Sequence, residues 1–138
     1  MKRLTMKKLT AHLLVAWFAI FVSQVSADDH QENISPAAST GQIVLVYHWP
    51  CADLNRGLSV LRDMIAYESA NSPHKYSAVP AVHEDGALAS IDVHGSQKSM
   101  DLAIVWQEKD EIWQSYLSEM ASACGSVDDL TVKALEIN

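Results

Sequence analysis

Hydrophobic and polar positions along residues 42–138 form a pattern that predicts six elements of secondary structure. Residues 43–49 are a continuous apolar run, rich in β-branched and aromatic side chains, as is typical of a strand buried on both faces. Residues 52–70 predict a helix, because leucine and isoleucine recur at helical spacing from Leu54 to Ile65. We assign Glu68 to the polar faces of this helix.

Residues 76–94 predict a β-hairpin, with Asp85-Gly86 as a two-residue turn. Such a turn pairs His83 with Leu88 and places Asp92 and His94 on the same face as Val79. Because Pro80 cannot donate a backbone hydrogen bond, the first arm of the hairpin is expected to be an edge strand.

Residues 96–124 predict a second helical region, divided by a break near Glu108-Lys109 with Asp110 as a cap. Its apolar residues form one stripe at helical spacing: Leu102, Trp106, Trp113, Leu117, Met120 and Cys124. Residues 130–137 predict the last strand. The alternative, a strand over residues 100–107, would interrupt the stripe. The order β-α-β-β-α-β then gives an α+β, ferredoxin-like fold, with two helices on one face of a four-stranded antiparallel sheet.

Residues 1–27 have the pattern of a signal peptide. Four basic residues precede a short apolar run, and Val25-Ser26-Ala27 is a small-x-small cleavage site. We therefore expect an exported protein, periplasmic or secreted, that is cleaved after Ala27 and has no membrane anchor afterwards. Residues 28–41 are expected to be a disordered polar leader, and residues 42–138 the folded domain.

Cleavage would remove four of the ten basic residues and none of the 17 acidic residues, which leaves a net charge of −11. Such a surface repels phosphate backbones and anionic membranes, so nucleic-acid binding is not expected.

The two cysteines, Cys51 and Cys124, are an even count, which favours a disulfide in an exported protein. In the predicted topology Cys51 precedes the first helix and Cys124 ends the second, so both lie at one end of the domain. The alternative is a pair of buried free thiols.

Candidate catalytic residues are His48, Asp92 and His94. His48 ends the first strand, where its ring could exchange a proton near neutral pH. Asp92 and His94 are two residues apart on one strand, so they share a face and could form a carboxylate–imidazole pair. Structural roles for all three remain the alternative. The spacing of these residues matches no metal motif, and no phosphate-binding loop or other cofactor signature is present.

The chain also resembles the dimeric α+β barrel superfamily, which includes NIPSNAP-like, antibiotic-biosynthesis-monooxygenase-like and stress-responsive barrel proteins. The resemblance rests on the element order and on Ser99-Met100 followed by the run from Trp106 to Trp113. It implies a homodimer with facing sheets and a ligand cavity between sheet and helices. The Asn, Trp and His of haem-degrading members have no matching set here.

We interpret the chain as an exported homodimeric domain that binds a small apolar molecule, with Tyr47, His48, Trp106 and Trp113 as candidate ligand contacts. Residues 43–49 are apolar on both faces, although helices cover only one, so a partner is expected on the other. The alternatives are a cofactor-independent monooxygenase or isomerase, and a structural or interaction module; we favour binding over catalysis. A closed polar cavity containing His48 or His94 would favour the enzyme, and a cavity filled by Trp and Leu the module.

Overall fold

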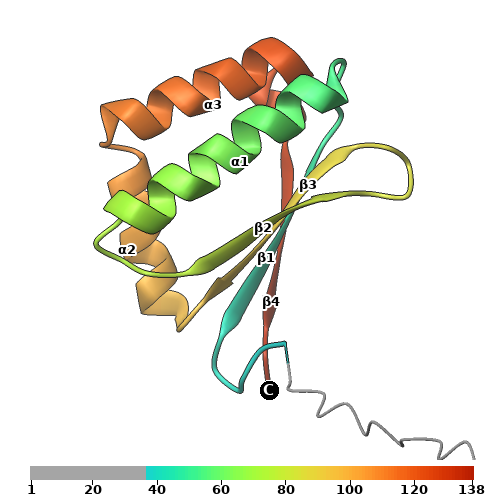
Figure 1. Cartoon of the computed structure of the whole chain (residues 1–138). Helices are drawn as coiled ribbons and strands as arrows, with labels where there is room; N and C mark the ends of the chain where they lie inside the picture. The colour runs from blue at the N-terminus through green and yellow to red at the C-terminus, as the bar shows by residue number, and fades with distance from the viewer. Residues whose placement is uncertain (1–36) are drawn as a thin grey trace, which may run out of the picture. The chain divides into compact units, whose positions relative to one another are not determined.

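A computed structural model describes residues 37–138, which form a sheet with helices packed on one face (Figure 1). The predicted signal peptide and residues 28–36 of the predicted leader lie outside the described residues. The elements are β1 (Ile43–Trp49), α1 (Leu54–Asn71), β2 (Ser77–Val82), β3 (Leu88–His94), α2 (Gln97–Gln107), α3 (Glu111–Cys124), a short 3₁₀ helix (Val127–Asp129) and β4 (Thr131–Glu136). No helix within residues 37–138 is long and apolar enough to cross a membrane.

The four strands form one sheet in the order β2-β3-β1-β4, and every neighbouring pair is antiparallel. This is the predicted ferredoxin-like arrangement. The edge position of β2, expected from Pro80, is confirmed. The alternative strand over residues 100–107 is wrong, because these residues belong to α2.

The predicted hairpin register is wrong by one residue. Val82, and not His83, pairs with Leu88, because three residues rather than two form the loop between His83 and Ala87. Gly86 closes this loop at φ +85°, a conformation that suits glycine. A one-residue slip moves every side chain of one strand to the other face relative to its partner. Asp92 therefore lies opposite Ala78, and not beside Val79, on the face that the helices cover.

Side-chain caps start the three helices. Asp53 accepts a hydrogen bond from Arg56 N at 3.1 Å, Ser96 from Ser99 N at 3.2 Å, and Asp110 from Trp113 N at 2.9 Å. The predicted break and the cap at Asp110 are thus confirmed.

The predicted apolar stripe does not run unbroken across that break. The chain changes direction between α2 and α3 (Figure 1), and Leu102 of α2 remains 40% exposed. Met120 and Cys124, at the other end of the stripe, are buried in the core.

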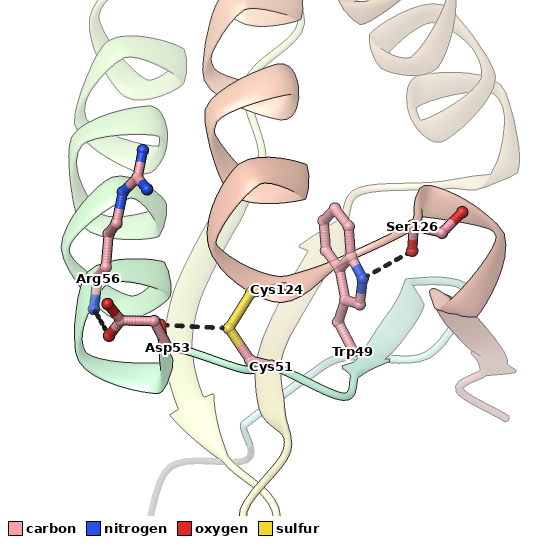
Figure 2. Close-up of a disulfide and its surroundings, with 6 residues drawn as sticks. All are labelled: Trp49, Cys51, Asp53, Arg56, Cys124 and Ser126. Atoms are coloured by element: carbon pink, nitrogen blue, oxygen red, sulfur yellow. Dashed lines mark hydrogen bonds between the residues drawn. A yellow bond between two sulfur atoms is a disulfide. The ribbon is translucent and has the colours of Figure 1, made fainter.

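The predicted disulfide joins Cys51 to Cys124, across a sequence separation of 73 residues (Figure 2). It ties the start of α1 to the end of α3, and Asp53 N donates to Ala123 O at 3.0 Å beside it. A Cβ atom on Gly57 would lie 2.7 Å from Cys51 Sγ and 2.9 Å from Cys124 Sγ. Glycine at this helical position therefore lets the bridge pack directly against α1.

Candidate functional site

A cavity of about 230 Å³ lies between the sheet and the helices. Most of its lining is apolar. Leu61 and Met64 come from α1, Leu117 and Met120 from α3, and Trp49 from β1. Apolar positions at helical spacing on α1 and α3 turn these side chains toward the sheet. The cavity can thus accept the apolar body of a small molecule.

Polar groups gather at one part of this lining. Asp92 of β3 accepts a hydrogen bond from Ser90 Oγ at 2.6 Å. Glu68 of α1 accepts hydrogen bonds from Trp113 Nε1 and, at 3.3 Å, from Gln107 Nε2. All five residues line the cavity, and both carboxyl side chains are only 6% exposed.

Burial makes both carboxyl groups weaker acids than usual. It raises the pKa of Asp92 to about 7, since the hydrogen bond from Ser90 offsets only part of the desolvation and Glu68 adds repulsion. Burial also raises the pKa of Glu68, against the opposing hydrogen bonds from Trp113, Tyr76 and Gln107. The phenol of Tyr47, another cavity residue, has a raised pKa from burial and from the nearby acids. Near neutral pH, Asp92 can therefore either hold or release a proton.

His94 lies on the same face of β3 as Asp92 but does not line the cavity. Its ring is 1% exposed and stacks on Tyr76, with centroids 4.5 Å apart. Burial lowers the pKa of His94, and its Nδ1 has no hydrogen-bond partner. The predicted carboxylate–imidazole pair with Asp92 is therefore not formed. Tyr76 connects this ring to the site, because its hydroxyl accepts a hydrogen bond from Gln107 at 2.8 Å.

His48 lies on the opposite face of the sheet from the cavity, because it alternates with Tyr47 and Trp49 along β1. Its Nε2 is 2.9 Å from Asp85 Oδ2 in the hairpin loop, and its ring centroid is 4.6 Å from that of His83. The structure therefore separates His48 from Asp92.

Of the predicted ligand contacts, Tyr47 and Trp113 line the cavity and Trp106 does not. The ring of Trp106 stacks on Tyr67 instead, with centroids 6.2 Å apart. The cavity is neither closed around a histidine, as expected of an enzyme, nor filled by Trp and Leu side chains, as expected of a structural module. It therefore matches neither of these two expectations.

Sequence reasoning missed Glu68 and Gln107. The assignment of Glu68 to the polar faces of α1 is wrong, since this side chain is 6% exposed and faces the cavity. A signal was present: Glu68 follows Leu61 by seven residues and Met64 by four, which places it on the apolar stripe of the helix. Gln107, on the last turn of α2, had no comparable signal.

The face of the sheet that the helices leave uncovered carries aliphatic side chains. Val79 is 52% exposed, Ile91 37% and Leu135 53%, on β2, β3 and β4 respectively. Neighbouring apolar patches of this kind mark interaction surfaces. Within residues 37–138, no three His, Cys, Asp or Glu side chains are grouped in a way that could hold a metal ion.

Comparison with solved structures gives matches that share this fold. A putative antibiotic biosynthesis monooxygenase from Caulobacter crescentus is 16% identical, with a TM-score of 0.54, over 72% of this chain and 92% of that one. SnoaB from Streptomyces nogalater, a cofactor-independent oxygenase, is 8% identical, with a TM-score of 0.56, over 72% and 95%. A NIPSNAP family protein from Agrobacterium tumefaciens is 14% identical, with a TM-score of 0.54, over 68% and 90%.

These likenesses confirm the predicted resemblance at the level of the fold, which is that of the dimeric α+β barrel proteins. No protein-family model matches the chain, and no curated protein matches it.

Proposed function

We propose that this protein is an exported homodimeric domain that binds a small, mainly apolar molecule between its sheet and its helices. The observation that carries the proposal is the cavity of about 230 Å³, with an apolar lining and one polar region. Pockets of this composition are typical of small-molecule sites, where a few polar groups orient an apolar ligand. An engineered apolar cavity of about 150 Å³ can hold benzene, so this one has room for a substituted ring.

The homodimer is supported by the uncovered face of the sheet, where Val79, Ile91 and Leu135 are exposed. Burying apolar area contributes about 25 cal/mol per Å², so a second copy placed face to face would be stabilised by these side chains. One of the solved structures with this fold, a protein of unknown function from Jannaschia, is described as a dimeric ferredoxin-like protein. Light scattering of the purified protein at micromolar concentration tests this point, and a monomeric mass would contradict it.

Export is supported by the pattern of residues 1–27, and the disulfide fits an oxidising compartment. The mass of the protein recovered from the periplasm or the medium should correspond to a chain that starts at Asp28. Recovery of the uncleaved chain in the cytoplasm would contradict export.

Calorimetric titration with 2-phenylethanol, an apolar ring with one hydroxyl, tests ligand binding. We expect saturable binding to the wild type and strong weakening in Leu117→Trp, whose larger side chain would occupy the cavity. The matched control is Ile112→Trp on the same helix, since Ile112 is 54% exposed and does not line the cavity. Equal binding to both variants would place the ligand elsewhere and contradict the proposal.

A second candidate function is proton transfer on the bound molecule, as in a cofactor-independent oxygenase or isomerase. The pKa of about 7 for Asp92 favours it, because a general base works best near the ambient pH. Deuterium exchange into the α-carbon of phenylacetone in D₂O measures such a base without knowledge of the natural substrate. Exchange by the wild type that is lost in Asp92→Asn would support catalysis, and equal rates with and without protein would exclude it for this probe.

A further inference from the structure

Two buried carboxyl groups meet at the cavity without a basic partner. Asp92 comes from the sheet and Glu68 from α1, and each is 6% exposed. No lysine, arginine or histidine lines the cavity. Within residues 37–138 the sole ion pair joins His48 to Asp85, on the other side of the sheet. Buried acids in proteins are normally paired with a cation, because an isolated charge in an apolar medium is costly.

The hydrogen bonds within the protein leave one carboxyl oxygen of Asp92 without a donor. Ser90 Oγ donates to Oδ1, and no group in residues 37–138 donates to Oδ2. Glu68, in contrast, receives donors from α2 and α3. Asp92, a residue that is only 6% exposed, thus contributes to the cavity lining a carboxyl oxygen that lacks a protein partner.

We infer that the ligand of this cavity is an apolar amine, whose ammonium group lies between Asp92 and Glu68 and whose carbon body fills the apolar part. This inference rests on the proposed function and names its ligand class. The ammonium group would supply the missing donors to Asp92 Oδ2 and the missing positive charge. Tyr47 and Trp113 line the same region, and aromatic rings attract cations.

A small set of titratable groups determines how the charge of the site changes with pH. Glu68 faces it from α1, Tyr47 from β1 and Asp92 from β3, with Tyr76 just ahead of β2. The residues that α2 and α3 contribute to the polar region, Gln107 and Trp113, do not titrate. The phenols stay neutral because their pKa values are raised, and burial lowers the pKa of His94, the ring that stacks on Tyr76, which favours its neutral form. His74 and Lys75 line a separate hollow that Glu68 also borders, and not the cavity itself. The carboxyl groups therefore determine the charge within the cavity.

Binding of a protonated amine therefore requires Asp92 to ionise. Because the pKa of Asp92 is about 7, the ionised fraction of the free protein rises about tenfold between pH 6 and pH 8. Affinity for an amine should rise by about the same factor, and affinity for a neutral alcohol of the same shape should not.

The test is calorimetric titration of the full, oxidised protein with three probes of one shape: 2-phenylethylamine, 2-phenylethanol and phenylacetate. We expect the amine to bind at least about tenfold more tightly than the alcohol at pH 8, with a smaller margin at pH 6. Phenylacetate should bind most weakly. Asp92→Asn should bring the amine down to the level of the alcohol. Asp85→Asn, which removes an exposed carboxyl on the opposite face, should leave the preference unchanged.

The outcomes separate this inference from the proposed function. Equal binding of amine and alcohol, or tightest binding of phenylacetate, would overturn the amine inference and leave an apolar ligand site in place. Failure of all three probes to bind would contradict both. If Asp92→Asn does not fold, Glu68→Gln gives the same comparison, and an unchanged amine preference in that variant would also overturn the inference.

Discussion

Replacing Asp92 by Asn should make the protein more stable at alkaline pH and leave its stability at acidic pH nearly unchanged. Asp92 is buried against the cavity with one hydrogen bond, from Ser90 Oγ. The carbonyl oxygen of an asparagine can accept the same bond, so the substitution removes the charge and little else.

The magnitude follows from the pKa of the buried carboxyl. Burial raises the pKa of Asp92 from 3.8 to about 7 in the folded state. Between these values the folded protein holds a proton that the unfolded chain has released, so the free energy of unfolding falls as the pH rises. From pH 5.5 to pH 8 the fall due to Asp92 alone is about 2 kcal/mol, at 1.36 kcal/mol per pH unit up to the folded pKa.

Urea denaturation of wild type and Asp92→Asn at pH 5.5 and pH 8 measures this quantity. The difference in free energy of unfolding between the two proteins should shift by about 2 kcal/mol in favour of the variant at pH 8. Other titrating groups contribute to both proteins and largely cancel.

Asp63→Asn is the matched control. Asp63 is exposed on α1, and its side chain takes part in no hydrogen bond or ion pair within residues 37–138, so no neighbouring group changes its interaction with Asp63 between the two pH values. Its difference from wild type should be the same at pH 5.5 and pH 8. A difference for Asp92→Asn that is equally independent of pH would refute the argument that Asp92 is an acid weakened by burial.

Further predictions concern the disulfide, its packing and the dimer. Cys124→Ser should lower the free energy of unfolding by about 4 kcal/mol in the chain-entropy model, measured by urea denaturation against the oxidised wild type. Gly57→Ala should lower it by about 1–3 kcal/mol, because the added methyl group meets both sulfur atoms, whereas Gly95→Ala has open space and should be neutral; equal effects would contradict the close packing. Ile91→Lys should give a monomeric mass by light scattering, whereas Ile112→Lys on α3 should remain dimeric; a dimer in both would exclude the uncovered face as the interface.

The fold could be predicted because its signals are local and repeated. Helical spacing, the cap at Asp110 and the proline in β2 each act within a few residues and agree with one another. Agreement at these positions favoured the topology in which Cys51 and Cys124 meet over the alternative with a strand at residues 100–107.

The cavity could be predicted only in part, because its chemistry depends on register and on distant packing. The Asp85-Gly86 pair predicts a turn but not the number of residues in the loop. One extra loop residue changed which side chains share a face with Asp92. Glu68 was not predicted as a cavity residue because its side chain is charged, and charged residues on a helix are usually assigned to the solvent-exposed faces. Gln107, the last residue of α2, reaches the site through hydrogen bonds to Glu68 and Tyr76, which lie 39 and 31 residues earlier in the chain, and helical spacing does not predict such distant contacts.

Methionine methyl NMR tests the central claim, a ligand cavity between sheet and helices, most directly. Met64 and Met120 line the cavity from α1 and α3, whereas Met100 of α2 is half-buried outside it. Titration of ¹³C-methyl-methionine protein with 2-phenylethanol should shift the signals of Met64 and Met120 in a saturable way and leave Met100 unchanged. Uniform small shifts, or a shift of Met100 without the other two, would contradict a binding site in this cavity.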